Sequence, residues 1–179
     1  MASTVYYTAT SLDGFIADRD GSLDWLFRQE QDGSGQLGFD AFLPRIGAVV
    51  MGSTTYEWVL AQGVDPWPYH VPTWVLSTRE LPRVDGDVRF ARGDVRTVHQ
   101  EMVAVAGERD RWVVGGGELA GQFADAGLLD EVIVTIAPVT LGGGAPLLPR
   151  TLDLHLEELE RTGGFAAARY TVTGPPRAG

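Results

Sequence analysis

The chain has 179 residues, of which 44% are hydrophobic and 21% are charged, and its formal net charge is −10. This length predicts one domain over residues 1–179 with a substantial core, and the negative charge argues against binding to nucleic acids and to anionic membranes. The sequence contains no cysteine, which excludes disulfides, thiolate nucleophiles and iron–sulfur ligands.

Metal binding and membrane insertion are not expected either. The three histidines, His70, His99 and His155, do not stand at metal-ligand spacing. No apolar run approaches the roughly 18 residues that span a bilayer, and the N-terminus lacks a basic segment followed by an apolar stretch. We therefore expect a cytoplasmic protein without a bound metal.

The first half of the chain alternates strand and helix patterns. Asp13-Gly14 predicts a turn after the first strand, and Pro66 and Pro68 stand too close together for a regular element to continue. The expected strands are 4–10, 47–51 and 73–77, and the expected helices are 39–43 and 55–61.

The second half continues the alternation and then changes character. Asp94 is a suitable N-cap for the helix predicted after it, and Gly127 is a suitable end for the next helix. We expect strands at 88–91, 111–114 and 130–136, helices at 95–106 and 118–126, and a C-terminal hairpin of 154–161 with 167–173 around 162–164. The pattern predicts an α/β protein whose mostly parallel central sheet carries antiparallel strands at its C-terminal end.

The most informative segment is the triplet Gly115-Gly116-Gly117, which lies between a predicted strand and a predicted helix. A bare-backbone turn at a helix N-terminus exposes N–H groups that favour a phosphate or pyrophosphate. The alternative is a turn that serves packing alone. A second turn of this kind, Gly52-Ser53-Thr54-Thr55, follows the strand 47–51, and its alternative is an ordinary Ser/Thr cap. Neither turn has the Lys of a Walker loop or the Gly-x-Gly-x-x-Gly spacing.

The order of several motifs resembles the dihydrofolate reductase fold. The resemblance runs from Val5 to Thr173, and its last motifs are more specifically similar to the reductase domain at the C-terminal end of the bacterial bifunctional riboflavin-biosynthesis deaminase-reductase. The motifs that carry it are 9–17, 50–57, 75–77, 113–119, 127–131, 135–139 and 141–144. It implies a three-layer fold, with helices on both faces of the mostly parallel sheet and a C-terminal antiparallel hairpin.

The resemblance further implies NADPH as the cofactor. It assigns the two glycine turns to the pyrophosphate and residues 76–79 to the adenosine end. Ala9, Ile16, Ala17 and Val114 are assigned to the nicotinamide. Arg79 is the positive charge that would meet the 2′-phosphate, whereas Ser53 stands where dihydrofolate reductases usually carry an arginine. The implied cofactor-binding residues are Ala9, Ile16, Ala17, Gly52, Ser53, Thr54, Thr55, Leu76, Ser77, Thr78, Arg79, Val114, Gly115, Gly116, Gly117, Glu118 and Leu119.

The catalytic and substrate residues have weaker signals. Glu30 follows Trp25 at about the spacing of the carboxylate in dihydrofolate reductases, and Asp13 is a second candidate proton donor; a surface acid and a turn residue are the alternatives. Trp25, Trp58, Trp67 and Tyr69 are all able to stack on a flat substrate, with core packing as the alternative. We take Trp25 and Trp67 as the substrate-binding candidates.

The resemblance implies an NADPH-dependent oxidoreductase that transfers a hydride to a planar heterocycle, similar to 5-amino-6-(5-phosphoribosylamino)uracil reductase of riboflavin biosynthesis. It also implies a homodimer formed through the late strands. The alternatives are a dihydrofolate or pterin reductase and a non-catalytic, NADPH-binding dimeric protein. Basic residues other than Arg79 are scattered singly along the chain, which weakens the assignment to a phosphorylated substrate.

Overall fold

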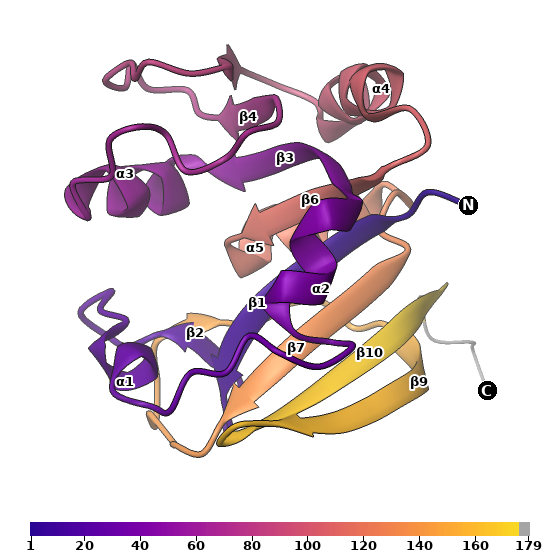
Figure 1. Ribbon diagram of the computed structural model, residues 1–179. Helices are drawn as coiled ribbons and strands as arrows, with labels where there is room; N and C mark the ends of the chain where they lie inside the picture. The colour runs from indigo at the N-terminus through magenta and orange to yellow at the C-terminus, as the bar shows by residue number, and fades with distance from the viewer. Residues whose placement is uncertain (176–179) are drawn as a thin grey trace.

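An eight-stranded sheet forms the centre of the molecule (Figure 1). The computed structural model describes residues 1–175. The strands follow the order β5-β4-β3-β6-β1-β7-β10-β9, and those from β5 to β7 are parallel. Their bounds are β1 Thr4–Ser11, β3 Ile46–Gly52, β4 Thr73–Leu76, β5 Val88–Ala91, β6 Asp110–Gly115 and β7 Glu131–Ala137. The first strand therefore lies inside the sheet, between two strands that come much later in the chain.

The predicted C-terminal hairpin is confirmed. Strands β9 (Asp153–Thr162) and β10 (Phe165–Gly174) pair antiparallel, and β10 pairs antiparallel with β7. The turn between them contains Gly163, whose φ of 57° lies in the left-handed region that favours glycine. A register shift leaves Glu157 without a counterpart in β10, so the strand contains a bulge.

The sheet separates two hydrophobic clusters, and alternate residues of each strand enter opposite ones. In β1, Tyr6 belongs to the cluster under α4 and α5, whereas Val5 and Tyr7 belong to the cluster under α2 and α3. The helices are α2 Phe39–Phe42, α3 Ser53–Ala61, α4 Val95–Ala106 and α5 Gly117–Asp125. Because helices cover both faces, the predicted three-layer α/β fold is confirmed.

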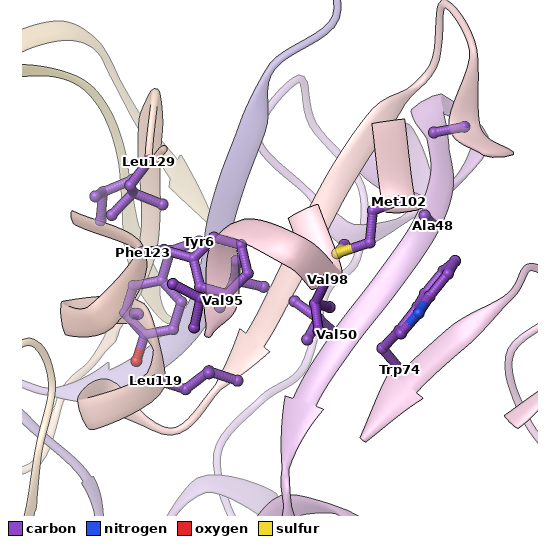
Figure 2. Packing of buried hydrophobic residues seen from close by; sticks show 14 of the residues in the cluster. Tyr6, Ala48, Val50, Trp74, Val95, Val98, Met102, Leu119, Phe123 and Leu129 are labelled. Atoms are coloured by element: carbon purple, nitrogen blue, oxygen red, sulfur yellow. The ribbon is translucent and has the colours of Figure 1, made fainter. Parts of the chain in front are cut away.

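The cluster under α4 and α5 is the larger one, and Figure 2 shows its side chains between these helices and the strands. Phe123 and Met102 come from the two helices and are fully buried. Tyr6 lies beside them, and its hydroxyl donates to the carbonyl of Leu147 at 2.9 Å. This bond ties the core of the sheet to the loop that follows strand β8 (Ala145–Pro146).

Three short elements were not predicted. Strands β2 (Phe15–Ala17) and β8 (Ala145–Pro146) pair antiparallel in a separate two-stranded sheet, and α1 spans Asp24–Phe27. The predicted turn at Asp13-Gly14 is present, with Gly14 at a φ of 86°. Elements of two to four residues lack the periodicity from which a helix or strand is predicted. In addition, 3-10 helix η1 (Leu43–Arg45) extends α2 and includes Pro44.

Candidate functional site

A cleft of about 940 Å³ opens at the carboxyl ends of the parallel strands. Its walls are formed by the segments that follow β3, β4, β5 and β6, together with β2, β8 and the start of α1. In open α/β sheets this edge is where ligands bind, because the loops that leave the strands and the N-termini of the following helices meet there. The volume also suits a ligand of cofactor size.

Two helices begin at the cleft without a side-chain cap. Gly52 is the N-cap of α3 and Gly116 is the N-cap of α5, and neither helix start receives a hydrogen bond from a capping side chain. Helix α4 differs, because the carboxylate of Asp94 accepts from the backbone N–H of Arg96 at 2.9 Å. Both helix starts in the cleft thus keep unpaired N–H groups and a positive dipole end for an anionic ligand.

The three positions of the triplet differ in why a glycine stands there. Gly115 has a φ of 139°, which side-chain-bearing residues rarely adopt. A Cβ atom on Gly117 would collide with the backbone carbonyls of Pro146 and Leu147. A Cβ atom on Gly116 would meet only the Ile16 Cδ1 atom at 3.7 Å. Gly115 and Gly117 therefore serve the fold, and Gly116 is the glycine that leaves space toward the cleft.

One end of the cleft carries the positive charge. Arg79, which follows β4, forms a two-pronged salt bridge with Glu57 of α3, at 3.0 Å and 2.7 Å. The guanidinium lowers the pKa of Glu57, and the carboxylate raises the pKa of Arg79. Arg92, which follows β5, lines the same end. An adjoining cavity of about 480 Å³ shares Arg79 and Arg92 and adds Arg83, so this end can accept a phosphate.

The other end is aromatic and uncharged. Thr8, Leu23, Trp58 and Tyr69 line it, near Ile16 and Ala17 of β2. The Phe27 ring of α1 stacks on the Trp58 indole of α3, with ring centroids 5.8 Å apart and an interplanar angle of 10°. Burial raises the pKa of Tyr69 to about 12.

The fold brings all but one of the predicted cofactor-binding residues to the cleft. All of them line the cleft except Ala9, which is partly buried in β1 opposite Thr135 of β7. Two further lining residues, Trp58 and Tyr69, were considered from the sequence only for stacking on a substrate. Sequence reasoning did not select Thr8, Gly21, Leu23, Val59, Arg92, Gly93, Gln122, Ala145, Pro146 or Pro149, which also line the cleft. The position of Arg92 could have indicated it, because Arg92 directly follows the strand predicted at 88–91. Arg79, which was selected, likewise comes just after the strand predicted at 73–77.

The two candidate proton donors do not line the cleft. The carboxylate of Asp13 accepts from the Ser11 hydroxyl at 2.6 Å and from the backbone N–H groups of Leu141 and Gly142 at 3.0 Å and 2.7 Å. These bonds lower the pKa of Asp13 to about 2, so the residue ties two loops together as an ionised group. Glu30 is exposed beyond the end of α1. For Asp13 these contacts agree with the alternative of a turn residue, and the proton-donor role of both residues stays a prediction.

The two tryptophans proposed for substrate stacking belong to the core. Trp25 is 3% exposed and packs with Ala137 and Phe165, and Trp67 is 5% exposed in the cluster under α3. The indole N–H of Trp25 donates to the carbonyl of Ser22, at 3.1 Å. Neither side chain lines the cleft, so for these two residues the alternative of core packing holds. Trp58 is the tryptophan that faces the cleft.

Acidic side chains have little part in the cleft. Among its lining residues within 1–175, Glu118 is the one carboxylate. Arg150 holds it with two hydrogen bonds, at 2.8 Å and 3.1 Å, and lowers its pKa. Glu118 is therefore an ion-pair partner of Arg150. In the same range of residues, no helix is both long and apolar enough to cross a membrane.

Comparisons with known proteins agree with this geometry. Residues 3–164 match the family model of the RibD C-terminal domain. The chain is 37% identical over 166 residues to the uncharacterized protein YwjB of Bacillus subtilis (strain 168), covering 92% of this chain and 93% of that protein. It is 30% identical to the riboflavin biosynthesis protein RibD of Mycobacterium tuberculosis (strain ATCC 25618 / H37Rv) over 87% of this chain, but spans only 50% of that longer protein.

Solved structures show the same relationship. A protein from Shewanella sp. PV-4, whose name relates it to riboflavin biosynthesis, superposes with a TM-score of 0.81 at 30% identity and covers 96% of this chain and 99% of its own. A dihydrofolate reductase from Enterococcus faecalis, complexed with NADP(H), superposes with a TM-score of 0.59 at 16% identity, over 96% of each chain. The latter similarity shows that the fold is shared.

Proposed function

The chain belongs to the RibD C-terminal domain family, and from this premise we propose that it is an NADPH-dependent oxidoreductase that reduces a planar heterocyclic substrate. Membership in a family of reductase domains supports the reductase-like role. The cofactor and the reaction are inferred from the cleft. The observation that carries the proposal is a pair of helix N-termini that open on the cleft without a side-chain cap: α3 begins after Gly52 and α5 begins after Gly116.

The residues of the cleft fit a dinucleotide cofactor. The N–H groups at the starts of α3 and α5 would bind the pyrophosphate, with the hydroxyls of Ser53, Thr54 and Thr55 as further donors. The open space beside Gly116 would let the pyrophosphate approach the backbone. This arrangement needs no lysine, because backbone donors and two helix dipoles supply the positive potential.

Arg79 and Arg92 would bind the 2′-phosphate that distinguishes NADPH from NADH. Both lie at the end of the cleft reached from β4 and β5, and guanidinium groups pair with phosphate through two parallel hydrogen bonds. Ile16, Ala17 and Val114 would line the nicotinamide pocket at the other end. We therefore propose that the protein prefers NADPH.

When bound, the reduced nicotinamide supplies a hydride, and the substrate also takes up one proton. The chain's own contribution is to hold both partners in an apolar pocket beside Leu23 and Trp58. Neither Asp13 nor Glu30 lines this pocket, so the proton would come from a hydroxyl or from solvent. The non-catalytic alternative predicts that NADPH binds but is not oxidised by any acceptor.

A titration with NADPH and NADH side by side tests the proposal. We expect micromolar binding of NADPH and weaker binding of NADH, measured by calorimetry or by the fluorescence of the reduced cofactor. Failure of both to bind would show that the glycine turns serve packing, and the proposal would be abandoned. Binding without oxidation by pterin, aminopyrimidine and flavin-precursor acceptors would favour the non-catalytic alternative.

We also propose a homodimer that forms through β9. Leu154, Leu156 and Leu159 are 41%, 48% and 66% exposed. The bulge at Glu157 changes the alternation of β9 so that all three leucines share one face of the strand. A contiguous apolar stripe on an edge strand is typical of an association surface. Light scattering of the protein and of the Leu156→Glu variant would test this, with a dimer expected for the first and a monomer for the second.

A further inference from the structure

We propose that the aromatic end of the cleft takes an uncharged, planar ring compound without a phosphate group, which lies against the Trp58 indole and accepts a hydrogen bond from the Tyr69 hydroxyl. The proposal rests on the proposed function, since it names the substrate of that reductase. It departs from the phosphoribosylamino substrate that the sequence resemblance implies.

Positive charge is confined to one end of the cleft. Among its lining residues within 1–175, the cations are Arg79 and Arg92, and both follow strands at the far end of the sheet. Around Thr8, Leu23 and Trp58 there is no lysine, arginine or histidine among the lining residues. A phosphate placed there would lose part of its hydration without gaining an ionic partner, which is unfavourable. The net charge of −10 would oppose it further.

The Trp58 indole forms a flat aromatic wall of the cleft. Trp58 lines the cleft, and Phe27 supports it from the outside by stacking at 5.8 Å. Phe27 is 57% exposed, so the pair connects α1 with α3 at the surface. A large flat apolar wall favours a flat aromatic partner, because offset stacking adds to the burial of area.

Tyr69 lines the cleft beside this wall and is held by packing against the core. Its ring lies edge-on to the core residues Trp67 and Trp112, with centroids 5.4 Å and 5.5 Å away, and this packing restricts its orientation. Three other tyrosines, Tyr6, Tyr7 and Tyr56, donate their hydroxyl protons to backbone carbonyls. Among the side-chain hydrogen bonds within residues 1–175, none involves the Tyr69 hydroxyl, and the residue lines the cleft.

The protonation state of Tyr69 agrees with a donor role. Burial raises its pKa to about 12, so the phenol keeps its proton throughout the physiological range. A neutral phenol donates well to a ring carbonyl oxygen or to a ring nitrogen. It carries no charge that would pair with a phosphate, so it suits a ring with an acceptor atom at its edge.

Two pairs of compounds that differ only in a phosphate test the proposal. These are riboflavin with flavin mononucleotide, and 5-amino-6-(ribosylamino)uracil with its 5′-phosphate. Binding of each compound to the full chain saturated with NADP⁺ would be measured by calorimetry. We expect the unphosphorylated member of at least one pair to bind about tenfold more tightly or better. Equal or tighter binding of the phosphorylated members, or no binding of either unphosphorylated ring, would overturn the proposal.

A variant separates the Tyr69 hydroxyl from the general shape of the cleft. Tyr69→Phe should weaken binding of the preferred ring by roughly tenfold, the effect of one hydrogen bond, and should leave NADPH affinity and Tm unchanged. Tyr56→Phe is the matched control, because it removes a buried hydroxyl that donates to the Pro82 carbonyl outside the cleft. It should lower Tm without changing ring affinity. Unaltered ring affinity in Tyr69→Phe would contradict the assigned contact.

The same preparation distinguishes the two levels of inference. If NADPH fails to bind, the proposed function is wrong. If NADPH binds and the phosphorylated rings are preferred, the reductase function stands and only the substrate class is wrong.

Discussion

The two ends of the cleft are built in different ways. The end that we assign to the cofactor consists of backbone turns and helix starts, with charge added by Arg79 and Arg92. The aromatic end consists of side chains that reach one pocket from β1, α1, α3 and the segment before β4, among them Thr8, Trp58 and Tyr69. The first depends on short local motifs and the second on tertiary contacts. A ligand that is common to a family can therefore be bound by a constant frame while substrate recognition changes through single side chains.

The largest effect on cofactor binding is expected at Gly116, whereas a change at Gly117 should affect stability. Gly116→Val should weaken NADPH binding by about a hundredfold or more, because its side chain would occupy the approach of the pyrophosphate to the backbone. The fold should remain, since the nearest atom to a Cβ there is Ile16 Cδ1 at 3.7 Å. Titration and thermal unfolding would measure the two properties.

Gly117→Ala is the matched control for that variant. Its methyl group would collide with the carbonyls of Pro146 and Leu147, so Tm should fall markedly. If Gly116→Val folds normally and binds NADPH as well as the parent protein, the turn is a packing device and the assigned difference between the two ends disappears.

The next effect concerns the charged end alone. Arg79→Gln should reduce NADPH affinity by about tenfold and leave NADH affinity unchanged, because only the former carries the 2′-phosphate. Arg96→Gln on α4 makes the same change of charge at an exposed site outside the cleft and should affect neither cofactor. Equal losses for both cofactors would show that Arg79 contacts another part of the dinucleotide.

A smaller effect, of opposite sign, is expected at Glu57. Its carboxylate occupies both prongs of the Arg79 guanidinium and would compete with a phosphate for them. Glu57→Gln should therefore raise NADPH affinity about threefold and leave NADH affinity unchanged. The ratio of the two dissociation constants is the measurement, and a fall in NADPH affinity would show that Glu57 holds Arg79 in its binding position instead.

The smallest effect tests the scaffold next to the aromatic end. The pKa of Asp13 is lowered from 3.8 to about 2, so its ionised form stabilises the fold above the ordinary pKa, and this contribution is lost as the pH falls toward 2. Asp13→Asn should lower Tm slightly at pH 7, and the difference from the parent protein should shrink below about pH 4. Any NADPH oxidation should persist in this variant. Its complete loss in a stable protein would support Asp13 as the proton donor.

The fold could be predicted wherever the chain contains a long periodic segment. The helix from Val95 to Ala106 and the strand before Gly115 are present as expected, with the C-terminal hairpin at Gly163. Strands β2 and β8 could not be predicted, because two or three residues carry no period and their pairing joins segments that lie far apart in the chain.

The cofactor end of the site was equally accessible to sequence reasoning, because its turns are contiguous motifs that match a family. The aromatic end was not. Trp25, Trp58 and Trp67 gain similar area by burial, so nothing in their local sequence tells which ones enter the core and which one faces the cleft. The fate of Asp13 was partly predictable, since Asp-Gly favours a turn, but its partners at 141 and 142 come from the opposite part of the chain.

The place of β1 inside the sheet also has a consequence for biosynthesis. Thr4 contacts Arg111 and Asp130, which lie 107 and 126 residues further along the chain. A nascent chain that emerges from the ribosome therefore carries the first strand, which is mostly buried in the folded protein, without either neighbour until most of the protein has been made. Closing such long loops delays the pairing.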